Sequence, residues 1–119
     1  MDESVVRNLL LTERTAALHR LHSMKADFEA IVADAMTSNA DDEHDPEGST
    51  IAYERARVAA LIAWAQSDLD ELEHAMARLS DGSYSWCEAC HRQISEARLA
   101  ARPAVRTCID CASSPRPRW

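Results

Sequence analysis

Two long runs of the chain repeat apolar residues with alternating spacings of four and three. Such heptad repeats place apolar side chains on one face of a helix and are typical of coiled coils. The first run has one polar member and comprises Leu10, Arg14, Ala17, Leu21, Met24, Phe28, Ile31 and Ala35. The second keeps this alternation from Val58 onward, with Ile51 one heptad earlier, and comprises Ile51, Val58, Ile62, Ala65, Leu69, Leu72, Met76 and Leu79. We therefore predict two helices of about thirty residues, each about 45 Å long at 1.5 Å per residue.

A polar segment, NADDEHDPEGST at residues 39–50, separates the two runs. Asp45 followed by Pro46 is a helix-start signal, because Asp caps free N–H groups and Pro is tolerated at the first helical position. The second helix is expected to begin there or just after. Gly82 is expected to end it, because glycine readily adopts the left-handed conformation that closes many helices. A connection this short predicts an antiparallel hairpin, with residues 39–50 at the end away from both termini.

We call residues 39–50 the acidic tip. Its acids are Asp41, Asp42, Glu43, Asp45 and Glu47. Charge in a turn often serves only solvation. However, no Lys or Arg occurs between Ala26 and Glu54, and repulsion among these carboxylates is a cost that a neutral turn would avoid. A two-helix coiled coil also has no deep pocket, so binding would concentrate at its ends. The acidic tip is therefore a candidate for contact with a partner.

The strongest motif follows Gly82. Two Cys-x2-Cys pairs are separated by seventeen residues, and their members are Cys87, Cys90, Cys108 and Cys111. Two such pairs bring four thiolates to the corners of a tetrahedron, which suits one structural Zn²⁺ with a closed coordination shell. The alternative is two disulfides, with three ways of pairing the cysteines. The absence of an export signal favours zinc, because disulfides are rare in the cytoplasm.

Composition and charge narrow the function. The chain has 119 residues, only two of them Gly, and a net charge of −7, typical of a mainly α-helical protein. Residues 1–86 carry seventeen acids and seven bases, whereas residues 87–119 carry three acids and six bases. The acidic body argues against nonspecific binding to a phosphate backbone. Phosphate-binding loops, nucleophile elbows and H-E-x-x-H motifs are absent, so no enzyme is expected. Without an apolar span or basic leader, we expect a soluble, cytoplasmic protein.

We therefore expect an antiparallel helical hairpin over residues 1–82, a four-Cys zinc finger over residues 83–112 and a short flexible tail over residues 113–119. Trp64 lies one position before Ala65 of the second run and could flank the core or line a partner surface; of the two, we expect it to pack against the core. His91 directly follows Cys90 and cannot easily share its metal, so we expect it at the surface or near the zinc ligands without binding the ion.

The region around the cysteines resembles the DksA/TraR zinc-finger family of bacterial transcription regulators. The resemblance is dense after Asp81 and looser before it, and the preceding hairpin agrees with the larger members in length and placement. It rests on Asp81-Gly82-Ser83-Tyr84, Cys87-x2-Cys90, Ile94, Arg98-Leu99, Ala101-Arg102-Pro103 and Cys108-Ile109-Asp110-Cys111.

The resemblance implies a protein that binds RNA polymerase directly, without contacting DNA. The family inserts its coiled-coil tip through the secondary channel of the polymerase and alters initiation, often together with the alarmone ppGpp of the stringent response. Members of the DksA type carry Asp-Pro-x-Asp-x-Ala at the tip. Here Asp45 and Pro46 match, but Gly48 and Thr50 occupy the second Asp and the Ala positions.

The family binds ppGpp with basic residues around the base of the hairpin. Arg98 and Arg102 occupy matching places and are candidate contacts for the polymerase or the alarmone. Ala112 stands where a Lys is expected, and Glu71 stands near another such Lys position. These two departures argue against sensitivity to ppGpp.

Two functions of other classes stay open from the sequence. A nucleic-acid-binding zinc ribbon would use basic side chains to contact phosphates, with the hairpin as a spacer. A scaffold would dimerise through exposed residues of the heptad runs, although we expect a monomer. The basic residues of the first alternative are Arg92, Arg98, Arg102 and Arg106.

Overall fold

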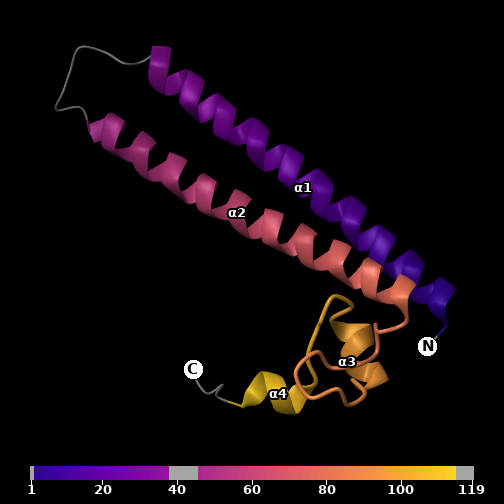
Figure 1. The fold of residues 1–119 in the computed structure, drawn as a ribbon. Coiled ribbons are helices and arrows are strands. Elements are labelled where there is room, and N and C mark those ends of the chain that lie inside the picture. Colours follow the sequence, from indigo (N-terminus) through magenta and orange to yellow (C-terminus); the bar gives the residue numbers. More distant parts are fainter. Residues whose placement is uncertain (1, 38–45, 115–119) are drawn as a thin grey trace. The chain divides into compact units, whose positions relative to one another are not determined.

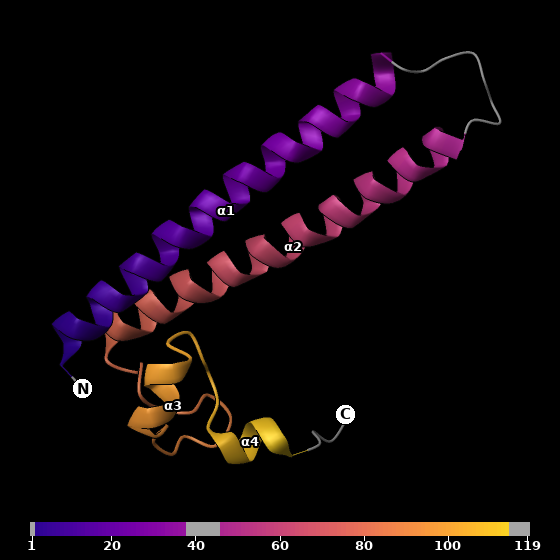
Figure 2. The same ribbon diagram turned by 180° about the vertical axis from the view of Figure 1, so that it is seen from behind.

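The computed structural model describes residues 2–37 and 46–114. It is mainly helical, as predicted, and its two long helices pack as an antiparallel hairpin that precedes a small four-Cys unit (Figure 1). Seen from behind, the two helices again run side by side (Figure 2). No helix of the described residues is both long and apolar enough to cross a bilayer. The helices are α1 (Glu3–Thr37), α2 (Pro46–Asp81), α3 (Glu96–Ala101) and α4 (Ile109–Ser113).

The second long helix begins and ends near the predicted positions, and both long helices exceed the predicted length of about thirty residues. α1 has 35 residues and no internal Gly or Pro, so at 1.5 Å per residue it is about 52 Å long. α2 begins at Pro46, as the Asp-Pro signal predicted. Gly82 follows its last residue with φ +86°, and Ser83 N donates to the carbonyl of Arg78 at 2.9 Å. This hydrogen bond spans five residues, as in a Schellman motif, so Gly82 ends the helix as expected.

The chain divides into two compact units, Met1–Thr15 with Leu69–Trp119, and Ala16–Asp68. In the second unit, the predicted heptad positions that are buried are Ala17, Leu21, Val58 and Ala65. In the first unit, both helices and the four-Cys unit supply the core. Its buried side chains include Val6, Leu10, Leu69, Leu72, Ala75, Leu79, Tyr84, Ile94 and Leu99. The heptad pattern therefore predicted the buried face of both helices.

The prediction that Trp64 packs against the core is wrong. Its side chain is 68% exposed, whereas the neighbouring Ala65 is 8% exposed. A helix turns by about 100° per residue, and at this point of α2 the turn from Ala65 back to Trp64 takes the side chain into water.

A candidate zinc centre held by the end of the second helix

The four cysteines lie close together, as their spacing predicted. The Sγ atoms of Cys87, Cys90, Cys108 and Cys111 all lie within 4.8 Å of one another, and those of Cys90 and Cys108 are 3.7 Å apart. Four sulfurs bound at about 2.3 Å to a tetrahedral Zn²⁺ stand about 3.8 Å from each other. The cluster therefore fits one structural zinc ion in a C4 zinc finger.

Backbone groups around Cys87 favour its thiolate form, which is the form that binds metal. Burial of this side chain raises the pKa of the thiol, but hydrogen bonds from backbone N–H groups outweigh that effect and lower the pKa to about 6. The donors are the N–H groups of Cys108, Cys90 and Ala89. In contrast, hydrogen bonds among the crowded sulfurs raise the pKa of Cys111 to about 12 when no metal compensates their charge. A divalent cation at the centre of the cluster compensates the negative charge of the thiolates.

The two pairs of cysteines lie on different local structures. Cys87 and Cys90 form a tight turn in which His91 N donates to the carbonyl of Cys87 at 2.9 Å. His91 is exposed, as expected, and has φ +62°, the left-handed conformation that usually favours glycine. Cys108 is the N-cap of α4, and Cys111 lies within that helix. Glu88 N donates to the carbonyl of Arg106 at 2.9 Å, which joins the two parts of the finger.

The side chain of Arg78 in α2 donates hydrogen bonds to two separate segments of the finger. Among the described residues, Arg78 is the one charged residue that is buried, at 4% exposure. Its Nη2 group is shared among the carbonyls of Ser83, Tyr84 and Trp86, at 3.2, 3.1 and 2.5 Å. Its Nη1 group donates to the carbonyl of Val105 at 3.2 Å. One guanidinium therefore positions the segment before Cys87 and the segment before Cys108.

A cluster of charged side chains surrounds this guanidinium. Glu88 Oε1 lies 2.5 Å from His74 Nε2 and 3.5 Å from Arg78 Nε, and Glu88 Oε2 lies 3.7 Å from Arg106 Nη1. The hydrogen bond with His74, aided by the nearby guanidinium charges, lowers the pKa of Glu88. Arg106 also donates twice to Glu71 of α2, at 2.7 and 2.8 Å. These ion pairs link the end of α2 to both halves of the finger.

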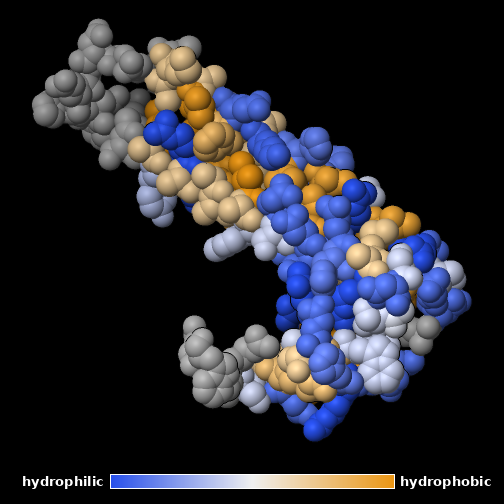
Figure 3. Space-filling view, in the orientation of Figure 1, coloured by the Kyte–Doolittle hydropathy of each residue, from blue (hydrophilic) through white to orange (hydrophobic). Residues whose placement is uncertain are grey.

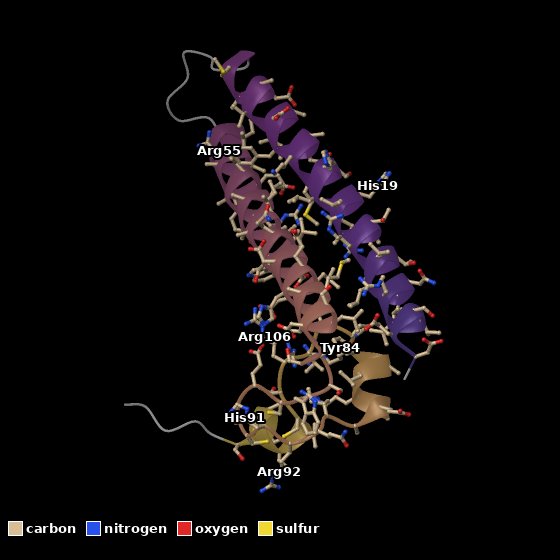
Figure 4. The ribbon with its side chains drawn as sticks, turned by 45° about the vertical axis from the view of Figure 1, so that its right-hand side comes forward. His19, Arg55, Tyr84, His91, Arg92 and Arg106 are labelled. Carbon is tan, nitrogen blue, oxygen red and sulfur yellow. The ribbon has the colours of Figure 1, made fainter. Side chains whose placement is uncertain are left out.

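The finger has a small core of its own beside the sulfurs. Tyr84 is 6% exposed, and its hydroxyl donates to the carbonyl of Pro103 at 2.7 Å. Burial raises the pKa of Tyr84, against a smaller opposing effect of the Arg78 charge. Ile94 and Leu99 are also buried. Figure 4 shows Tyr84 and Arg106 beside the last turns of α2 and Arg92 pointing away from that helix.

The structure describes only some of the predicted contact residues. Arg98 lies in α3 and is half-buried, and its Nε donates to the carbonyl of Thr107 at 2.9 Å. Arg102, the C-cap of α3, is exposed. Four tip acids, Asp41, Asp42, Glu43 and Asp45, lie outside the described residues, and the side chain of Glu47 is also outside them. Their role therefore stays a prediction.

Sequence reasoning missed Arg78 and Glu88. A basic residue in the last turn of a helix is usually explained by the helix dipole, and that explanation gives no hint of burial. A weak signal was available, because Arg78 lies one position before Leu79 of the heptad run and four before Gly82. A charged side chain at that point of the chain is close to both the core and the following turn.

Comparisons with known proteins agree with this geometry. Residues 82–115 match the family model of the prokaryotic dksA/traR C4-type zinc finger. An uncharacterized protein of Aquifex aeolicus is 41% identical over 44 residues, 37% of this chain and 30% of that protein. Protein YteA of Bacillus subtilis, also uncharacterized, is 31% identical over 72 residues, 60% of this chain and 30% of that protein. The RNA polymerase-binding transcription factor DksA of Escherichia coli is 35% identical over 43 residues, 36% of this chain and 28% of that protein.

A solved structure matches a larger part of the fold. Transcription factor DksA2 from Pseudomonas aeruginosa is similar with a TM-score of 0.78, over 92% of this chain and 79% of that one, at 22% identity. The alignments with the curated relatives span less than a third of their length. The similarity to the prokaryotic DksA/TraR C4-type zinc-finger family therefore lies in residues 82–115 and the four cysteines that they hold.

Proposed function

We propose that this chain is a bacterial transcription regulator that binds RNA polymerase directly and inserts the acidic tip into the secondary channel to modulate initiation. One observation carries the proposal: a hairpin of two long helices stands directly before a finger of the DksA/TraR type. The relative from Escherichia coli is named an RNA polymerase-binding transcription factor. The proposed partner also implies that the protein works in the cytoplasm.

In this proposal the zinc centre positions the hairpin and takes no part in chemistry. Four Cys ligands close the coordination shell of Zn²⁺, whereas catalytic zinc keeps a position for water or substrate. Zinc stabilises a finger that has few core residues, and the contacts of Arg78 connect the finger to the end of α2. The effect on the polymerase is then carried by the acidic tip.

The charge around the base of the hairpin supports a regulator that responds weakly or not at all to ppGpp. Glu71 places a carboxylate near a position where the family has a Lys, and that carboxylate is bound to Arg106. Arg98 already donates to the carbonyl of Thr107. A ligand rich in phosphate would therefore meet one exposed predicted guanidinium, that of Arg102.

The same contacts weaken the nucleic-acid alternative. Arg98 and Arg106 have protein partners, and only Arg92 and Arg102 of the four proposed phosphate contacts are exposed. Binding to bare DNA would show a steep salt dependence, because each neutralised phosphate releases counterions. We expect no such binding at physiological salt.

The role of the acidic tip is tested by the lifetime of promoter complexes. The test variant changes Asp41, Asp42 and Asp45 to Asn and Glu43 to Gln. A matched control removes four exposed acids of the helices by the same changes, at Glu13, Asp27, Glu29 and Asp68. We expect the wild type and the control to change the lifetime, and the tip variant to bind polymerase without changing it. A control variant as inactive as the tip variant would show that overall charge, and not the tip, is responsible.

A further inference from the structure

The outer face of α2 carries a stripe of apolar and aromatic residues that do not occupy heptad positions. Its six members are all exposed, and they fall within about a third of the helix circumference at 3.6 residues per turn. Tyr53 is 73% exposed and Trp64 is 68% exposed. Figure 3 shows hydrophobic colour along this part of α2. We call this set the α2 outer stripe: Ala52, Tyr53, Ala56, Ala60, Ala63 and Trp64.

Helix propensity accounts for the alanines but not for the aromatic residues. Alanine is the best helix former and is common on exposed helix surfaces. Tyr53 and Trp64 are poorer helix formers, and each leaves most of a large side chain in water. Tyr and Trp are the residues that most often dominate the energy of protein interfaces. Their spacing of eleven residues puts both on one face, with small residues between them.

The charges beside the stripe are nearly balanced. Residues 52–64 contain Glu54, Arg55 and Arg57, a sum of +1, in a half of the chain that is otherwise strongly acidic. Arg57 Nη2 lies 2.7 Å from Glu54 Oε1, so these two charges neutralise each other within one chain. Two copies of the protein can therefore approach at this stretch without the repulsion between acids that opposes their contact elsewhere.

We propose that the α2 outer stripe is the interface of a reversible homodimer in which two α2 helices pack antiparallel. Around a twofold axis near Val58, Ala56 of one copy lies opposite Ala60 of the other, and Tyr53 lies opposite Ala63. Each aromatic side chain then packs on alanines, and the alanines at the centre let the helices approach closely. In a parallel pair Tyr53 and Trp64 would each meet their own counterparts, and the layers between them would hold alanine against alanine.

The size of the stripe fits a weak dimer. In each copy, two aromatic side chains that bury about 150 Å² each are joined by four alanines. The two copies together would then bury roughly 1,000 Å² of surface, the lower limit of specific interfaces. We therefore expect dissociation in the micromolar range or above. Because the same helices are proposed to enter the polymerase channel, a dimer would also keep the hairpin out of it.

The test is sedimentation equilibrium of the full-length, zinc-loaded protein from about 1 µM to about 1 mM, the range in which weak interfaces dissociate. We expect the mass to rise with concentration from 13.3 kDa toward twice that value. Ala60→Glu places a charge at the centre of the stripe and should remain a monomer. Ala77→Glu, at an exposed alanine of α2 outside the stripe, should dimerise like the wild type.

A second variant tests the antiparallel arrangement. When Ala56→Arg is added to Ala60→Glu, each Arg faces a Glu of the other copy, so the dimer should return. In a parallel pair like charges would meet, and the double variant would stay monomeric. A wild-type mass that does not change with concentration, or dimerisation of Ala60→Glu, would overturn the proposal. A double variant that stays monomeric while the wild type dimerises would overturn the antiparallel pairing. These measurements need only the purified protein, so they do not depend on polymerase binding.

Discussion

The carboxylate of Glu71 in α2 accepts two hydrogen bonds from the guanidinium of Arg106, at 2.7 and 2.8 Å, across 35 residues of sequence. Both side chains are more than a third exposed, so water and salt screen the pair. This ion pair nevertheless has the two-pronged geometry that makes Arg and carboxylate groups bind specifically. It joins α2 to the segment that leads to Cys108.

The first prediction concerns the energy of this pair. Glu71→Gln should lower the free energy of unfolding of the zinc-saturated protein by about 0.5 to 1 kcal/mol, because partly exposed pairs contribute little. Urea denaturation at low and high salt measures it, and the loss should shrink as salt rises. In a double-mutant cycle, Glu71→Gln should cost almost nothing once Arg106→Gln is present. A full loss in that background would show that Glu71 acts through another contact.

A larger effect is expected at Arg78. Arg78→Met keeps much of the buried volume but leaves the carbonyls of Ser83, Tyr84, Trp86 and Val105 without their donor. Breaking such a buried charged network typically costs about 3 kcal/mol or more. Because this residue positions the segments before both cysteine pairs, zinc affinity should fall as well. Competition with a chromophoric chelator measures the affinity. Arg92→Met, at an exposed arginine of the finger, is the control and should bind zinc like the wild type.

Tyr84 predicts how stability changes at alkaline pH. Burial raises the pKa of its hydroxyl above the ordinary value of 10.0. The folded state therefore holds this proton more tightly than the unfolded state. The resulting contribution to the free energy of unfolding is fully present below pH 10. It is lost as the pH rises through the raised pKa of the folded protein. Tyr84→Phe should remove that part of the decline, and the difference in tyrosinate absorbance between wild type and variant reports the pKa directly. A Tyr84 pKa at or below 10 would contradict the packing described for this residue.

We expect the backbone at position 91 to accept glycine better than any β-branched residue. Its φ of +62° is costly for a residue with a Cβ atom, about 1 to 2 kcal/mol, whereas glycine adopts it freely. His91→Gly should leave the melting temperature of the zinc-loaded protein unchanged or slightly raised. His91→Val should lower it, since a β-branched side chain fits this conformation poorly. Equal melting temperatures for the two variants would argue that the turn after Cys90 adopts another conformation.

Local pattern was sufficient for the parts of this fold that depend on local chemistry. The heptad spacing predicted the buried faces of α1 and α2, the Asp-Pro pair and Gly82 marked the limits of α2, and the spacing of the cysteines predicted the metal centre. Each of these signals acts over a few residues or through a fixed geometry.

The contacts that hold the finger could not be predicted in this way. Arg78 is buried because carbonyls from residues 83–86 and from Val105 converge on it, and that convergence exists only once the finger has folded. The pair of Glu71 and Arg106 depends on the same long-range arrangement. Trp64 was misplaced because a residue beside a heptad position can face either the core or water, and the sequence alone does not decide between them.

The most direct test of the account is the binding of the purified, zinc-loaded protein to core RNA polymerase, measured by titration with a fluorescently labelled sample. We predict saturable binding with one protein per polymerase, and competition by a second factor that occupies the secondary channel. Binding should be lost when a chelator removes the zinc, because the finger that positions the hairpin then unfolds. If the zinc-loaded protein does not bind core polymerase, the proposed function is wrong, and the acidic tip is a solvated turn.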